Sequence, residues 1–253
     1  METIKHGKAS LSVNPSFGGR IIDCTLTHPT RGALPIFWNG EYSKADTWIH
    51  GGNPFLFPFA GRFPGPLHGE LHAHVARVEG HDNRIEVVQV LQSAEVKHEY
   101  ALSETSIRIT TTIHNKGSST LSAAPGWHPY FSLPEGGAQL FCQSEKMFEV
   151  SEGRAVRPGK SFSGQLELPS SFARNGILGK VGGQVRLIHS SGELIWKMDL
   201  NGFSYLVLWS PEGQPFQCIE PWSGLPDALE NGVGLQKIPP GQDFRTEFRL
   251  SVC

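Results

Sequence analysis

Long apolar runs are missing from this 253-residue chain. Its longest apolar segment, at residues 205–209, falls far short of the roughly 20 residues that a membrane-spanning helix needs. The first five residues also lack the apolar core of a secretory signal. We therefore expect a cytoplasmic protein with no membrane partner.

The chain also lacks any strong charge excess and any close pair of cysteines. Its formal net charge is −2, and Lys and Arg are scattered, so the basic footprint of a nucleic-acid-binding protein is absent. The four cysteines, Cys24, Cys142, Cys218 and Cys253, are widely separated and form no CxxC pair. In a reducing cytoplasm such cysteines are expected to be buried free thiols.

Clean helical periodicity is missing too, since no segment of twelve or more residues shows it. Apolar and polar residues instead alternate at 85–90, 106–113 and 243–250, which predicts half-buried strands separated by turns rich in Gly and Pro. Strands at 194–198 and 203–209 are predicted to form a hairpin through Asn201-Gly202. We expect one all-β domain over residues 1–253, an antiparallel β-sandwich with a closed barrel as the alternative.

Two short segments combine an ionisable side chain with proline and aromatic rings. His128 lies in Gly-Trp-His-Pro-Tyr-Phe (126–131), and Glu220 lies in Cys-Ile-Glu-Pro-Trp (218–222). An imidazole titrates near neutral pH, and a carboxylate is its natural partner in proton transfer. Aromatic faces beside them suit the C–H surface of a sugar ring. The pair predicts general acid/base chemistry in a carbohydrate site, with attraction raising the pKa of His128 and lowering that of Glu220.

Two further segments carry candidate binding groups. The apolar loop at residues 51–63 contains one cation, Arg62, which suits recognition of hydroxyl or phosphate groups. Beyond it, His72 and His74 with Glu79 have the ligand spacing of cupin metal sites, and on a strand the two histidines would share a face. The rest of the cupin pattern is missing, so we expect no metal, and a metal-dependent cupin-like enzyme is a minor alternative.

These motifs, taken in order, resemble the aldose 1-epimerases, or mutarotases. The resemblance rests on Gly-Gly-Asn-Pro, Phe-Pro and Gly-Arg within 51–62, His-Gly at 68–69, the His-Pro-Tyr-Phe and Ile-Glu-Pro elements, and Gly-Leu…Ile-Pro-Pro-Gly at 234–241. It extends from about residue 12 to residue 252. It implies a galactose mutarotase-like β-sandwich and an isomerase of carbohydrate metabolism that needs no cofactor. It also implies a small-molecule sugar as the partner and a monomer or homodimer.

The resemblance assigns residues to roles as well. It implies that His128 is the general acid and Glu220 the general base of anomer exchange. Arg62 and His68 match residues that contact the sugar. The remaining residues expected to hold the ring are Asn53, Trp127, Tyr130 and Trp222.

The chain departs from the family pattern in two places, and these leave the substrate open. It reads His-Gly-Glu-Leu-His at 68–72, where the hexose-6-phosphate branch has His-Gly-Phe-Ala-Arg. It also has no match for an acidic residue that grips sugar hydroxyls in the galactose enzymes. A hexose and a hexose 6-phosphate are both compatible with the chain, and a non-catalytic carbohydrate-binding sandwich is the main alternative to an enzyme.

Overall fold

A computed structural model describes residues 1–40, 50–61, 67–151 and 154–253. Strands dominate these residues, and every pairing between the named strands is antiparallel. Arg62, one of the residues expected to contact the sugar, lies outside the described residues. No described helix is long and apolar enough to cross a membrane.

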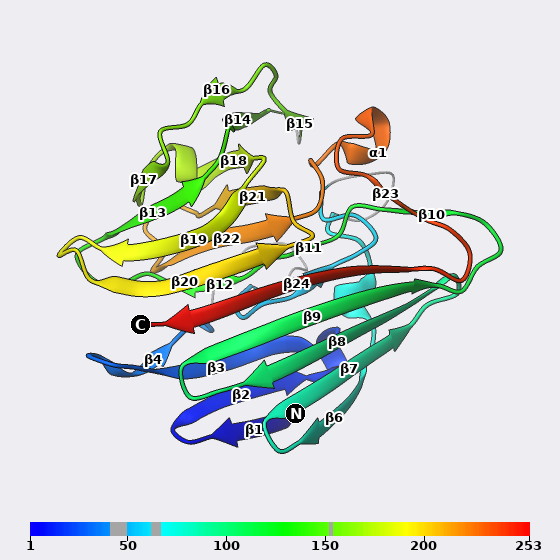
Figure 1. Cartoon of the computed structure of the whole chain (residues 1–253), viewed down its shortest axis with the longest axis horizontal. Coiled ribbons are helices and arrows are strands. Elements are labelled where there is room, and N and C mark those ends of the chain that lie inside the picture. The colour runs from blue at the N-terminus through cyan, green and yellow to red at the C-terminus, as the bar shows by residue number, and fades with distance from the viewer. Residues whose placement is uncertain (41–49, 62–66, 152–153) are drawn as a thin grey trace.

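The first of two nine-stranded sheets extends across the whole view of Figure 1. Its strands in spatial order are β17 (Gln165–Leu168), β13 (Ala138–Gln143), β19 (Gly182–His189), β20 (Leu194–Asn201), β24 (Asp243–Val252), β9 (Ser106–Asn115), β8 (Ala94–Leu102), β7 (Arg84–Val90) and β6 (Arg77–His81). Alternation sets which face of this sheet is buried. Along β8, for example, the buried side chains are every second residue, including Val96, Tyr100 and Leu102.

The second nine-stranded sheet contains Glu220, in β22 (Phe216–Trp222), and positions His128, which directly follows β11 (Gly126–Trp127). Its main path is β15 (Arg154–Ala155), β14 (Lys146–Ser151), β18 (Asn175–Gly179), β21 (Tyr205–Trp209), β22, β11 and β5 (Phe55–Leu56), with β12 (Tyr130–Ser132) beside β22 and β16 (Lys160–Ser161) beside β14. All seven residues of β22 are buried. This strand pairs with β21, β11 and β12, so it is an interior strand of the sheet.

Smaller elements complete the molecule. A four-stranded sheet contains β1 (Glu2–His6), β2 (Ala9–Asn14), β3 (Arg20–His28) and β4 (Gly32–Pro35), and a two-stranded sheet pairs β10 (Leu121–Ala123) with β23 (Gln236–Ile238). The helices of the described residues are the 3-10 helices η1 (Pro15–Phe17), η2 (Leu71–Ala73) and η3 (Phe172–Arg174), and the α-helix α1 (Ala228–Asn231).

The main hydrophobic core draws on both nine-stranded sheets. Trp127 and Phe131 from the second sheet belong to the same cluster as Trp196, Phe248 and Leu250 from the first. The rings of Phe131 and Trp196 are 4.6 Å apart, centroid to centroid. The predicted all-β antiparallel sandwich is therefore confirmed, and the strands expected at 85–90, 106–113 and 243–250 are β7, β9 and β24.

Two details of the sequence-based prediction are wrong. The segments around Asn201-Gly202 do not form a hairpin, because β20 belongs to the first sheet and β21 to the second. Gly202 has φ +82°, so the chain bends at this glycine, and it then passes to the other layer. Among the cysteines, Cys24, Cys142 and Cys218 are buried free thiols as expected, whereas Cys253 is exposed.

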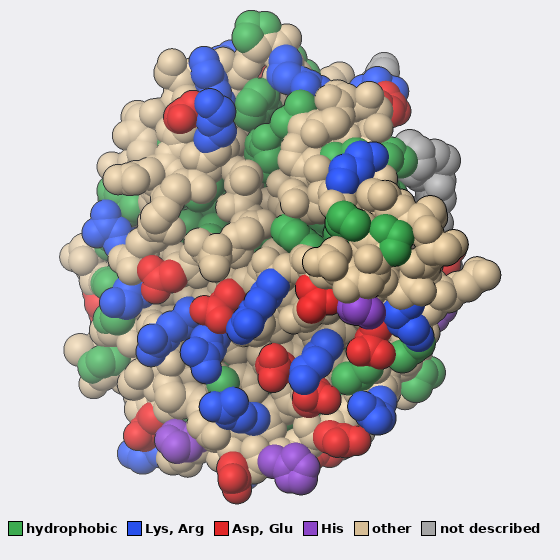
Figure 2. Space-filling view, turned by 45° about the vertical axis from the view of Figure 1, so that its right-hand side comes forward, with side chains coloured by type: hydrophobic (Ala, Val, Ile, Leu, Met, Phe, Trp, Pro, Cys, Tyr) green, Lys and Arg blue, Asp and Glu red, His purple; other side chains and the backbone are tan. Residues whose placement is uncertain are grey.

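The surface carries charges of both signs. Figure 2 shows Lys and Arg side chains interspersed with Asp and Glu side chains on one face of the molecule. Exposed ion pairs account for part of this mixture, such as Lys97 with Glu86 at 2.6 Å. The face in view therefore lacks the one-sided basic character that nucleic-acid binding requires.

Candidate active site

His128 and Glu220 meet in the second sheet. His128 follows the last residue of β11, and its backbone N–H donates to the carbonyl of Pro54 over 3.0 Å. Glu220 lies in the buried strand β22. His128 Nε2 is 3.6 Å from Glu220 Oε1, and the two side chains are 6% and 2% exposed. The fold thus brings together two ionisable groups that are 92 positions apart in the chain.

Strand periodicity explains how these groups come to face each other. Cys218, Glu220 and Trp222 are alternate residues of β22 and project from the same face of the sheet. Tyr130 of β12 is paired with Cys218, which places its ring beside the same face. The Tyr130 and His128 rings stack with centroids 4.7 Å apart at an angle of 10°. The phenol ring therefore fixes the plane of the imidazole.

Two neighbouring side chains, those of Trp222 and His68, interact with the His128–Glu220 pair. Trp222 Nε1–H donates to Glu220 Oε2 over 3.1 Å. The ring of His68 meets that of His128 edge to face, with centroids 5.1 Å apart. His68 Nδ1 donates to the carbonyl of Ala60 over 2.7 Å, so the proton of the neutral ring is on Nδ1. Burial lowers the pKa of His68 to about 4, which keeps the ring neutral.

Burial also decides the protonation of the pair, against expectation. It lowers the pKa of His128 well below its usual value, and nearby His68 and Arg20 lower it further. It raises the pKa of Glu220 well above its usual value, and the hydrogen bond from Trp222 opposes this rise. The sequence predicted opposite shifts from mutual attraction. That prediction is wrong because desolvation disfavours both charged forms. An imidazole and a carboxylic acid are favoured over an imidazolium and a carboxylate.

Of the residues expected to hold the sugar, Tyr130 and Trp222 contact the pair and Trp127 does not. Trp127 is 1% exposed, and its ring packs in the core against Phe55, His98, Tyr100 and Phe248. These contacts make Trp127 a core residue.

Asn53 is fully buried next to this region. Its backbone N–H donates to Ile21, and its side-chain oxygen and nitrogen have no hydrogen-bond partner among the described residues. A buried amide with both polar ends unsatisfied is costly, unless another group such as a ligand hydroxyl satisfies it. The substrate-binding role of Asn53 stays a prediction.

Sequence reasoning missed Arg20, His50 and Cys218 at this site. Arg20 is buried, donates to the carbonyl of Gly51, and lies close enough to His128 and Cys218 to affect their pKa values. His50 Nδ1 and the Tyr130 hydroxyl are 3.1 Å apart. Of these three residues, only Cys218 could have been predicted from the sequence, because a residue two positions before Glu220 on a strand lies on the same face of the sheet. Nothing in the sequence around Arg20 or His50 marks them.

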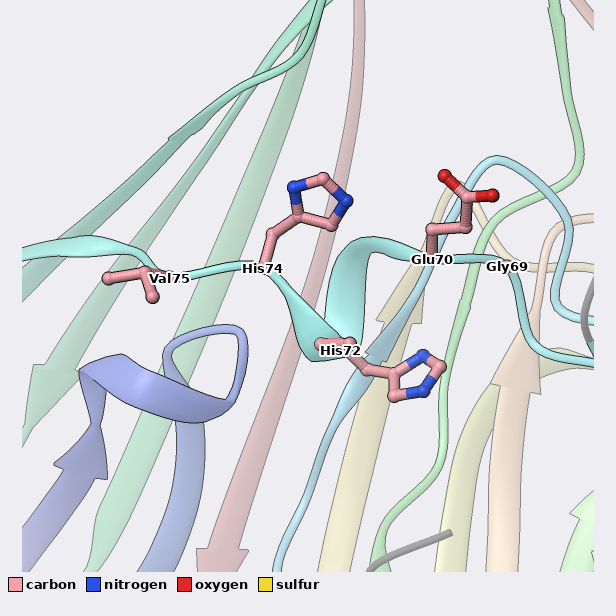
Figure 3. A pocket seen from close by; sticks show the side chains of 6 residues that line it. Gly69, Glu70, His72, His74 and Val75 are labelled. Atoms are coloured by element: carbon pink, nitrogen blue, oxygen red, sulfur yellow. The ribbon is translucent and has the colours of Figure 1, made fainter. Parts of the chain in front are cut away.

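The histidines with cupin-like spacing come from a separate segment, and His72 borders the site. Burial and nearby Arg20 lower the pKa of His72, and burial and nearby His72 lower that of His68. His72 belongs to the 3-10 helix η2 rather than to a strand, and His74 follows that helix. Figure 3 shows the two rings on opposite sides of the ribbon, in a pocket that Gly69, Glu70, Ala73 and Val75 also line. Glu79 is on β6, where its carboxylate is 3.7 Å from Arg77. The predicted shared face is wrong because this segment is helical, and these three residues do not assemble a metal site.

No family model matches the chain. Among curated proteins it is similar to the uncharacterized protein YphB of Escherichia coli, with 25% identity over 173 residues that cover 62% of this chain and 59% of that protein's length. It is also similar to the chromosomal LacX protein of Lactococcus lactis, with 24% identity, 82% of this chain and 81% of that protein covered.

Solved structures match over nearly the whole chain. A galactose mutarotase-like protein from Lactobacillus casei has a TM-score of 0.82 at 19% identity and covers 99% of each chain. Slr1438 from Synechocystis has a TM-score of 0.80 at 23% identity, over 96% of this chain and 91% of that one. A putative aldose 1-epimerase from Escherichia coli has a TM-score of 0.75 at 22% identity, over 98% and 97%. These likenesses establish the fold.

Proposed function

Because this chain has the galactose mutarotase-like fold, we propose that it is an aldose 1-epimerase, which interconverts the α and β anomers of a hexose or hexose 6-phosphate. The observation that carries this proposal is the buried contact between His128 and Glu220, with Nε2 and Oε1 3.6 Å apart. Such a pair offers one proton donor and one proton acceptor in a site shielded from water. The names of the matched structures point to the same class of reaction.

The reaction needs only proton transfers. A base removes the proton from the anomeric hydroxyl while an acid protonates the ring oxygen, and the bond from C1 to the ring oxygen breaks. The resulting aldehyde turns about its bond to C2. Ring closure on the other face returns both protons. In this proposal Glu220 is the base and His128 is the acid.

The short separation of the pair suits this geometry. The hydroxyl oxygen and the ring oxygen of a pyranose are bonded to the same carbon, so they lie closer together than the two catalytic atoms. Both side chains can then reach the sugar from one side at hydrogen-bonding distance, which is about 2.6–3.2 Å for proton transfer. Tyr130 restrains the imidazole, and Trp222 restrains the carboxyl group through its N–H donor.

The buried pair holds one proton that can lie on either partner. Imidazole with carboxylic acid and imidazolium with carboxylate contain the same number of protons. Burial favours the first form, and the indole N–H of Trp222 favours the carboxylate of the second. Hydroxyl groups of a bound sugar add hydrogen bonds to the carboxylate and shift the balance toward the charged form, in which Glu220 is the base.

Anomer-exchange NMR tests the proposal. The purified protein is added to glucose, galactose and their 6-phosphates, and exchange between anomers is measured by magnetisation transfer, with the Glu220→Gln variant as the control. We expect catalysed exchange for at least one sugar and its loss in the variant. Exchange at the solvent rate for every sugar, together with sugar binding by calorimetry, would instead support the non-catalytic carbohydrate-binding sandwich.

A further inference from the structure

We propose that His128, Cys218 and Glu220 form a binding site for a thiophilic divalent cation such as Zn²⁺, and that the cation excludes the sugar. The exclusion rests on the proposed function, whereas the binding of the cation does not. Among the described residues these three form the one group of potential metal ligands, with their ligand atoms all within 4.8 Å of one another.

The dimensions of the cluster suit a tetrahedral metal ion. With Zn–N and Zn–O bonds of about 2.0–2.2 Å, adjacent ligand atoms of a tetrahedron are roughly 3.3–3.6 Å apart. The observed distance from His128 Nε2 to Glu220 Oε1 is 3.6 Å. The outer limit of 4.8 Å for the cluster requires a modest inward rotation of side chains. A fourth position is left for water or another small ligand.

The sheet holds the three ligands on one face. Cys218 and Glu220 are alternate residues of β22, and His128 is held beside them by its stacking on Tyr130. All three residues are buried. Ligands on an interior strand are already positioned, so the cation orders few flexible groups when it binds.

The chemistry of the donors selects the cation. One sulfur, one nitrogen and one carboxylate oxygen suit Zn²⁺ or Co²⁺, whereas Mg²⁺ and Ca²⁺ prefer oxygen ligands alone. When a divalent cation binds, the Cys218 thiol and the His128–Glu220 pair each lose one proton to solvent, and the metal–sulfur, metal–nitrogen and metal–oxygen bonds form. The thiolate and the carboxylate offset the two charges of the cation. Arg20 nearby adds a positive charge, which weakens the binding.

A cation at this position blocks the proposed reaction. It occupies His128 Nε2 and Glu220 Oε1, the two atoms that would exchange protons with the sugar. The site is therefore inhibitory rather than part of the catalytic chemistry. We expect Zn²⁺ to inhibit the exchange of anomers in competition with the sugar.

Cobalt titration tests the binding directly. The chelator-treated protein is titrated with Co²⁺ while the absorption spectrum is recorded, because a thiolate ligand gives a charge-transfer band in the near ultraviolet. We expect this band at one equivalent in the wild type. Cys218→Ala should lose the band and bind Co²⁺ at least about 10-fold more weakly, since even the loss of a group that supports a ligand costs about 10–100-fold. Circular dichroism checks that the variant is folded.

Cys142→Ala is the matched control. Cys142 is also a buried cysteine in a strand, but it lies in β13 of the first sheet. This variant should bind Co²⁺ as the wild type does. The proposal fails if the wild type gives no charge-transfer band, or if Cys218→Ala keeps it.

The test separates this inference from the proposed function. Anomer exchange by the chelator-treated protein without any cobalt band would overturn only the cation site. A cobalt band in a protein that exchanges no sugar would overturn only the enzymatic proposal and the competition that rests on it.

Discussion

Trp127 and His128 are neighbours in the chain, but each belongs to a different buried cluster that contains histidine. On the core side, the ring of Trp127 packs against that of His98, with centroids 4.9 Å apart. His98 Nδ1 is 2.9 Å from the hydroxyl of Thr111. On the other side, His128 stacks on Tyr130 and lies 3.6 Å from Glu220.

The two clusters show that burial and aromatic contact do not by themselves mark a catalytic histidine. Burial lowers the pKa of both rings, to about 3 for His98. Aromatic side chains surround both. The difference is the partner: a hydroxyl for His98 and a carboxyl group for His128. Only the second arrangement contains two groups that exchange a proton readily with a third molecule.

The largest expected difference in activity comes from replacing the histidine of each cluster by asparagine. His128→Asn should lower the rate of anomer exchange by about 10²–10⁴-fold, because it removes a proton-transfer group. His98→Asn should leave the rate per folded molecule nearly unchanged. Polarimetry with the fastest-exchanged sugar measures both. Equal losses of activity in the two folded variants would contradict the distinction between the clusters.

In the core cluster, we expect a substitution to lower the stability of the protein rather than its activity. Trp127→Ala removes a buried ring from the core and should lower the free energy of unfolding by about 3–5 kcal/mol. Urea titration followed by circular dichroism measures this change. Activity per folded molecule should persist, because the ring does not contact the pair. A stable Trp127→Ala variant that has lost its activity would instead make Trp127 part of the site.

Acid should destabilise the protein through His98. Its folded pKa of about 3 is below the unfolded value of 6.5, so the unfolded chain gains a proton first as the pH falls. The stability from neutral His98 is present above pH 6.5 and is lost by about 1.4 kcal/mol per pH unit below it, until the folded ring titrates near pH 3. Urea midpoints between pH 7 and pH 4 should therefore fall less steeply in His98→Asn than in the wild type. Parallel slopes would mean that His98 is not held neutral.

The smallest effect concerns the hydrogen bond to Glu220. Trp222→Phe keeps an aromatic ring but removes the N–H donor, so the pKa of Glu220 should rise further. If Glu220 is the base, the acid limb of the pH–rate profile moves to higher pH, and activity at neutral pH falls by about tenfold, or roughly 1.5 kcal/mol. An acid limb at an unchanged pH would show that Glu220 does not act as the base.

Period-two alternation predicted much of the fold, because one face of each long strand is buried. It placed the strands at 106–113 and 243–250, which pair with each other in the first sheet. The hairpin through Asn201-Gly202 failed for a physical reason. Asn-Gly reports a tight turn but carries no information about which sheet the next strand joins. The hairpin that includes β20 is instead formed with the preceding strand β19 through residues 190–193, and the other side of β20 pairs with β24.

The candidate site was only partly predictable. His128 and Glu220 are marked by proline, aromatic neighbours and the resemblance to mutarotases. Arg20 follows two glycines in an unremarkable segment, and its proximity to the pair results from the packing of β3. The directions of the pKa shifts were also beyond the sequence, because they depend on how completely water is excluded from each side chain.

The position of Glu220 on a central strand has a consequence for the lifetime of the site. Cys218 and Trp222 of β22 pair with strands on both sides, and Glu220 pairs with Val207 of β21. The paired backbone amides of this strand therefore lie inside the sheet, where local fraying at its edges does not reach them. Their exchange with deuterium should require opening of the whole sheet. The carboxyl group then keeps its alignment for as long as the native state survives, and thermal inactivation should follow global unfolding without an earlier phase.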